Sequence, residues 1–270
     1  MPEKKLVQLT ELSRYVDEIA NLLPNERQPY VGRHAFAHKA GIHVSAIARH
    51  SSTYEHMSPS AIGNERRILI SELSGRSNVS FKSHEFSADL EKEPELSSKI
   101  VDRVKKYEQL GYQFEDADAS FKLLTAKALG KYKPFFALKS FRVSVEKNVF
   151  GKMVSEATVK LDVEGEEVHT VAEGDGPVNA LDGSLRKALV KFYPQISDVS
   201  LSDFKVRVIN AGAGTAAKVR VLIESRDSNS SWGTIGVSEN IIEASWEALV
   251  DSVEYKLMKS AGQKPAKKKK

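Results

Sequence analysis

The sequence predicts an α+β protein, in which N-terminal helical subdomains precede a domain that twice repeats the order strand, strand, strand, helix. Two observations predict this fold class. Apolar residues recur every three or four positions through much of residues 9–129, which is typical of amphipathic helices. After about residue 134, apolar and polar residues alternate in runs rich in valine, phenylalanine and threonine, which is typical of strands.

The N-terminal region contains several expected helices. Residues 9–23, LTELSRYVDEIANLL, have the spacing of an amphipathic helix that ends at a proline. A histidine-rich segment has helical spacing over about residues 38–50. Residues 51–80 hold a proline-bearing turn, the short strand-like run Ile-Leu-Ile and the loop Glu-Leu-Ser-Gly-Arg-Ser-Asn. Two further helices, separated by a glycine, are expected between residues 93 and 129.

The second region contains the repeat. Each half would form a sheet with one apolar face and a helix with one apolar stripe, and neither half could bury both surfaces alone. Packing the halves together solves this problem, so we expect one domain with a boundary in the segment GKYKPFF. The expected organisation is a linker helix and loop (1–34), helical subdomains (35–133), the repeated domain (134–258) and a disordered lysine-rich tail (259–270).

Composition restricts the class of protein. Hydrophobic residues make up 41% and charged residues 28% of the 270 residues, as in ordinary globular proteins. The chain has no apolar run long enough for a membrane span, and its N-terminus does not resemble a secretory signal. It has no cysteine, which excludes disulfides and thiolate metal sites. We therefore expect a cytoplasmic protein without a membrane partner.

The net charge of +4 comes from the C-terminus. The last twelve residues, KSAGQKPAKKKK, hold six of the 40 lysines and arginines, so 34 basic residues face 36 acidic residues elsewhere. A terminal run of like charge is usually solvated and disordered. No basic face is visible in the remaining sequence, and we expect no nucleic-acid partner.

Five of the seven histidines lie between residues 34 and 56. His38 and His43 are five positions apart, which on a helix separates them by about 140°, so they do not share a face as a zinc-binding pair would. A metal site made by these two is not expected. A hydrogen-bonded core or interface histidine is the structural alternative, above all for His38, and the other histidines are expected at the surface.

Three further features allow more than one interpretation. Tyr54 could pack its ring against a neighbouring element or donate a hydrogen bond to a developing oxyanion. In the loop at residues 72–78, Arg76 beside Gly75 could grip a carboxylate or phosphate, although such turns are common. The segment INAGAGTAAK (209–218) joins two expected strands and does not open a helix, so a flexible loop or small-ligand lid is favoured over a dinucleotide site.

Several segments together resemble the C-terminal half of citramalate synthases, which belong with the 2-isopropylmalate and homocitrate synthases. The shared patterns are H-K-x-G-I-H, T-Y-E-x-x-x-P and G-N-E-R-R in the N-terminal region. The resemblance continues through GDGPVNALDGSLRKAL and WGTIGVSENIIEASWEALVDSVEYKL, and the end of the latter favours the citramalate synthases. It covers nearly the whole chain apart from the lysine tail.

The resemblance implies a role in a condensation of acetyl-CoA with an α-keto acid, pyruvate for citramalate synthases. In this family a TIM barrel holds the keto acid on a divalent metal, and the C-terminal half reaches into the partner subunit's barrel. His43 is then implied as an acid/base or orienting residue near acetyl-CoA. Tyr54 is implied to assist at the enolate or carbonyl oxygen. His38, Asn64 and Glu65 are weaker candidates for supporting that site.

The chain also departs from the family pattern, because the barrel and its metal-binding H-x-H motif are missing. We expect no metal or cofactor in this chain, with the divalent metal in the missing barrel, and no activity of the chain alone. A catalytic TIM-barrel domain or subunit is the implied partner.

The repeated domain is implied to form a homodimer and to bind the feedback amino acid, isoleucine for citramalate synthases. Glycine and alanine in two loops would let the ligand approach backbone N–H groups that hold its carboxylate. A turn that caps a helix is the structural alternative for the first loop. The candidate effector-binding residues are Gly174, Gly176, Asn179, Ala180, Asp182, Ala211 and Gly212.

Two other functions remain open at this point. One is a stand-alone amino-acid-binding regulatory and dimerisation module without a catalytic role. The other is the leucine-sensing half of a 2-isopropylmalate synthase. Leucine and isoleucine differ only in the position of one methyl branch, worth roughly 1–3 kcal/mol in a fitted pocket, so the sequence does not firmly separate an isoleucine-sensing from a leucine-sensing domain.

Overall fold

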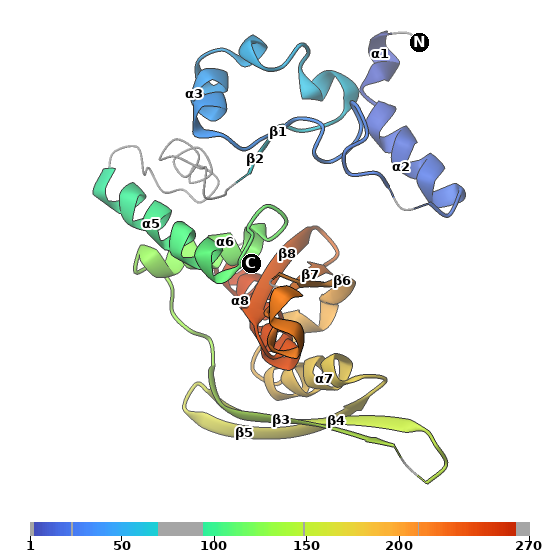
Figure 1. Ribbon diagram of the computed structural model, residues 1–270, viewed down its shortest axis with the longest axis vertical. Helices are drawn as coiled ribbons and strands as arrows, with labels where there is room; N and C mark the ends of the chain where they lie inside the picture. Colours follow the sequence, from blue (N-terminus) through green and yellow to red (C-terminus); the bar gives the residue numbers. More distant parts are fainter. Residues whose placement is uncertain (1–2, 23, 70–93, 148, 210, 263–270) are drawn as a thin grey trace, which may run out of the picture. The chain divides into compact units, whose positions relative to one another are not determined.

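The computed structural model describes residues 3–262, except residues 23, 70–93, 148 and 210 (Figure 1). The chain divides into two compact units, Met1–Lys106 and Tyr107–Lys270. The boundary expected near residue 134 falls inside the second unit, because helix α6 (Asp118–Ala128) packs against α8 (Ile241–Gly262) and β8 (Ser231–Ser238). No helix among the described residues is long and apolar enough to cross a membrane.

The first unit contains short elements. They are α1 (Glu3–Leu6), α2 (Leu9–Ile19), β1 (Ala37–His38), α3 (Gly41–Arg49), the 3-10 helices η1 (Ser51–Thr53) and η2 (Pro59–Ile62), and β2 (Arg67–Ile68). Helix α5 (Pro94–Leu110) contains the division between the units. The loop with Gly75 and Arg76 lies outside the described residues.

The helix expected over residues 38–50 begins only at Gly41, so the prediction was wrong for His38. His38 lies in β1, where it pairs in parallel with Ile68 of β2. Its backbone is extended because it bonds to a strand that is distant in the sequence, which helical spacing cannot reveal. The angle of about 140° between His38 and His43, which assumed one continuous helix, therefore does not apply.

The second unit confirms the α+β fold class and its repeated pattern. Strands β3 (Ala137–Lys147), β4 (Met153–Val163) and β5 (Glu166–Gly174) form one antiparallel sheet, followed by α7 (Pro177–Leu189). After η5 (Pro194–Asp198), strands β6 (Ser200–Val208), β7 (Val219–Arg226) and β8 form the second sheet, followed by α8. The 3-10 segment η6 (Ala211–Ala216) joins β6 to β7, and α8 continues to Gly262, into the segment expected as a tail.

The two halves of the second unit share one core. Helix α7 lies over β4 and β5, and α8 lies over β7 and β8 (Figure 1). Leu161 and Leu181 of the first half and Ile223 and Leu249 of the second half are all buried in the same cluster. Neither half buries its apolar face alone, as the repeat in the sequence predicts.

The contact of α6 with α8 contains a partly buried carboxyl group. Asp251 of α8 lies 3.9 Å from the Nζ atom of Lys127 on α6. Burial raises the pKa of Asp251 to about 7, and the nearby Glu254 carboxylate acts in the same direction, while a hydrogen bond with Ser120 opposes the rise. A cavity of about 250 Å³ opens beside Asp251, which explains why its side chain keeps 22% exposure.

Candidate functional site

The structure brings together the two residues that the sequence resemblance singles out. The rings of His43 and Tyr54 have centroids 4.1 Å apart and planes inclined by 31°. His43 lies on α3, in which Val44 and Ile47 are buried, and Tyr54 follows η1. His43 is half-buried and Tyr54 is 47% exposed, so both rings are accessible to a substrate.

The pair has the chemistry for proton transfer. An imidazole exchanges a proton near neutral pH, and a phenol donates a hydrogen bond to an oxygen that gains negative charge. Among the described residues, no group of three histidine, aspartate or glutamate side chains is arranged to hold a metal ion.

His38 does not join the ring pair. It is buried, and its Nε2 atom lies 3.1 Å from Oε1 of Glu55. Arg66 donates from Nε to Oε1 of Glu55 at 2.6 Å and from Nη2 to Oε2 at 2.5 Å. The hydrogen bond from Arg66 holds the pKa of Glu55 below its usual range against the opposing effect of burial, and the bond to His38 adds to it.

Sequence reasoning missed Glu55 and Arg66. Both were visible in the quoted patterns, because Glu55 directly follows Tyr54 in T-Y-E and Arg66 belongs to G-N-E-R-R. In the sequence, an acidic residue next to a proposed catalytic tyrosine and an arginine eleven positions later do not by themselves predict an ion pair. Only the fold brings the two side chains together.

Asn64 has a structural role and Glu65 is exposed. The amide nitrogen of Asn64 donates to the carbonyl oxygens of Tyr30 at 2.7 Å and Gly32 at 3.0 Å. Its side-chain oxygen accepts from the backbone N–H of Glu65 at 2.8 Å. Asn64 is buried, so these bonds fix the loop before β1.

Part of the first candidate effector loop makes close contacts within the domain itself. A Cβ added to Gly174 would lie 2.5 Å from the backbone nitrogen of Ala180 and from Oδ1 of Asn179, so the chain passes close to α7 there. The same Asn179 oxygen accepts from the N–H of Asp175 at 3.2 Å. Gly176 is the N-cap of α7, and an added Cβ there would meet open space.

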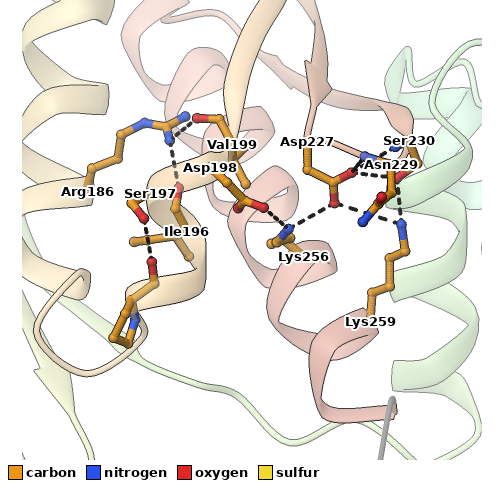
Figure 2. Close-up of polar contacts among 11 residues, drawn as sticks. Arg186, Ile196, Ser197, Asp198, Val199, Asp227, Asn229, Ser230, Lys256 and Lys259 are labelled. Carbon is orange, nitrogen blue, oxygen red and sulfur yellow. Dashed lines mark hydrogen bonds and ion pairs between the residues drawn. The ribbon is translucent and has the colours of Figure 1, made fainter. Parts of the chain in front are cut away.

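Asp182 holds an arginine of its own helix. Arg186 donates from Nε to both Asp182 oxygens, at 2.8 and 2.9 Å, and from Nη1 to the carbonyl oxygen of Val199 at 2.7 Å. Figure 2 shows this arginine reaching Val199 and Ile196. Arg186, which Asp182 holds in place, therefore links α7 to the segment that enters β6.

The second candidate loop is more open. It comprises η6, with a kink at Gly214, whose φ of +60° lies in the left-handed region. Ala211 begins this segment, and an added Cβ at Gly212 would meet open space. Of the seven candidate residues, Gly176 and Gly212 leave the backbone accessible, while Asn179 and Asp182 bond within the fold.

Comparison with known proteins identifies the family. Residues 115–257 match the family model of the LeuA allosteric (dimerisation) domain. The chain belongs to this family. Residues 30–112 match the homocitrate synthase post-HMGL domain-like family.

Curated relatives of this LeuA-family chain include citramalate synthases. It is 55% identical to the (R)-citramalate synthase of Geobacter sulfurreducens and 51% identical to that of Aquifex aeolicus, in each case over 96% of this chain and 49% of the relative. The identity to the enzyme of Synechocystis is 49%, over 94% of this chain. The chain spans about half the length of these relatives, which confirms the resemblance drawn from the sequence.

Proposed function

We propose that this chain is the C-terminal regulatory half of a citramalate synthase, which condenses acetyl-CoA with pyruvate in isoleucine biosynthesis. It supplies His43 and Tyr54 in trans to a TIM-barrel active site and binds isoleucine as feedback effector. The observation that carries the proposal is the contact of the His43 and Tyr54 rings at 4.1 Å, in a chain 55% identical to a citramalate synthase.

The two rings have separate tasks in the proposed reaction. Loss of a methyl proton from the acetyl thioester gives an enolate, which forms a bond to the keto carbon of pyruvate, and the thioester is then hydrolysed. His43 exchanges or orients the proton, because an imidazole works as acid and base near neutral pH. Tyr54 donates its hydroxyl hydrogen to the oxygen that becomes negative. The keto acid and the divalent metal belong to the barrel domain.

The effector site is proposed at the open backbone of the two loops. Gly176 precedes the first turn of α7, where free N–H groups and the helix dipole attract a carboxylate. Gly212 lies in η6 and leaves room for a ligand beside the backbone. Neither glycine carries a side chain that would block the amino acid. These features support isoleucine binding with its carboxylate on backbone N–H groups.

A homodimer is proposed because β6 leaves apolar side chains uncovered. Helix α8 packs on β7 and β8, while Phe204, Val206 and Val208 of β6 are 36%, 38% and 57% exposed. Alternate residues of a strand point to one face, so these three side chains form one apolar row. A second copy of the domain would cover this row.

The test of the proposed function is to join this chain to the N-terminal half of the Geobacter relative and to measure acetyl-CoA- and pyruvate-dependent release of the CoA thiol. We expect turnover from the joined enzyme and none from either half alone, because His43 and Tyr54 need the keto-acid site. A folded joined enzyme without turnover would contradict the catalytic part of the proposal and favour a stand-alone amino-acid-binding module.

A further inference from the structure

We propose that Glu55 and Arg66 are positioning residues, whose ion pair, extended by His38, holds the His43 and Tyr54 rings in contact. This inference deepens the proposed function and rests on it. The residues concerned lie in three segments of the first unit: β1, the segment after η1, and the segment before β2.

Tyr54 needs an anchor outside its own ring. It is 47% exposed, so little apolar surface fixes its position. The next residue, Glu55, is only 5% exposed and accepts two parallel hydrogen bonds from Arg66, at 2.6 and 2.5 Å. A bidentate arginine fixes the plane of a carboxylate as well as its distance. Holding Glu55 therefore fixes the backbone that carries Tyr54.

The same carboxylate also anchors the segment that carries His43. Oε1 of Glu55 lies 3.1 Å from Nε2 of His38, which ends β1 shortly before α3 begins. An ionised carboxylate only accepts hydrogen bonds, so His38 carries its proton on Nε2 in this contact. One glutamate thus joins the segment of Tyr54 to the segment of His43.

The opposite charges of Glu55 and Arg66 cancel each other. Arg66 neutralises Glu55, whose side chain is 2% exposed. The neighbouring residue Arg67 lies in β2 and pairs with Ala37 of β1, which places Arg66 at the end of this short sheet. The His43–Tyr54 contact is therefore a second link between segments that the network already joins.

The test follows the ring contact by NMR in the full chain with labelled histidine and tyrosine. We expect a nuclear Overhauser effect between the His43 and Tyr54 rings in the wild type, and its loss in Glu55→Gln, which removes the charge but keeps the shape. The matched control is Glu18→Gln, an exposed change on α2. An unchanged ring contact in Glu55→Gln would overturn the proposal.

A second variant tests the proposal if the first one does not fold correctly. If Glu55→Gln shifts the methyl resonances of the buried Val44 and Ile47, Arg66→Lys takes its place, because lysine keeps the charge but cannot form both bonds. Arg66→Lys should weaken the ring contact and leave those methyl resonances in place, with the exposed Arg14→Lys as its control. An unchanged ring contact would again overturn the proposal.

Turnover of the joined enzyme separates this inference from the proposed function. Glu55→Gln should lower kcat about 10- to 100-fold with little change in KM for pyruvate, because a small displacement of a reacting group is costly. Normal kcat in this variant would remove the positioning role while the function stands. No turnover in the wild-type joined enzyme would instead remove the function, whatever the NMR contact shows.

Discussion

His43→Ala is expected to lower turnover of the joined enzyme about 10²- to 10⁴-fold, the range that general acid–base catalysis contributes. KM for pyruvate should stay nearly unchanged, because the keto acid binds in the barrel and the lost interaction is made in the transition state. The measurement is steady-state release of the CoA thiol at saturating acetyl-CoA. The ring contact with Tyr54 is the observation behind this expectation.

The control for His43→Ala is His50→Ala, which removes an exposed imidazole beyond the end of α3 that contacts Ser52. We expect this control to turn over normally. Normal turnover in His43→Ala as well would reduce His43 to a structural residue and contradict its acid/base role.

Lys256→Ala is expected to lower the free energy of unfolding by about 3 kcal/mol, because it removes the nearest ammonium group from a buried carboxylate. Lys256 of α8 donates to Asp227 at 2.9 Å and to Asp198 at 3.0 Å (Figure 2). The side chain of Asp227 is 3% exposed, and the nearest other ammonium group, that of Lys259, is 3.9 Å away. Urea unfolding at pH 7 measures the loss.

The matched control is Lys191→Ala. Lys191 pairs with Glu166 at 3.0 Å, a comparable distance, but its side chain is 71% exposed and that of Glu166 is 55% exposed. An exposed pair contributes about 1 kcal/mol or less, so this variant should be nearly as stable as the wild type. Equal losses in the two variants would show that burial of Asp227 does not determine the effect.

The loss of unfolding free energy in Lys256→Ala should depend on pH. Burial raises the pKa of Asp227, but hydrogen bonds from Lys256 and from the N–H groups of Asn229 and Ser230 outweigh it and hold the pKa below its usual value of 3.8. A carboxyl group whose pKa is lowered by folding stabilises the fold above its unfolded pKa and loses that contribution in acid. The difference between wild type and variant should therefore shrink as pH falls below about 4.

The fold of the second unit could be predicted from the sequence because the patterns that specify it are local. Alternation along β4 places Ala157, Val159 and Leu161 on the buried face, and the turn at Glu164 and Gly165 has positive φ at both residues, as a tight hairpin requires. Each such feature lies within about ten residues, where periodicity and turn chemistry are informative.

The candidate site could be predicted from the sequence only in part, because its contacts join segments that are distant in the chain. The two-residue strand of His38 exists through its pairing with residues 67–68, and periodicity carries no sign of such a contact. The ion pair of Asp182 with Arg186, in contrast, has the spacing of neighbours on a helix and was visible in the sequence. The pairing of Asp182, a candidate effector residue, could thus be predicted from spacing, whereas the Glu55–Arg66 pair required the fold.

The most direct test of the regulatory assignment is calorimetric titration of the purified chain with isoleucine and then with leucine. We expect isoleucine to bind with a Kd between micromolar and millimolar, more tightly than leucine, and to bind more weakly after Gly212→Val fills the open space in η6. Tighter leucine binding would contradict the assignment to isoleucine feedback and favour a 2-isopropylmalate synthase. Binding of neither amino acid to the folded chain would contradict its role as a sensor.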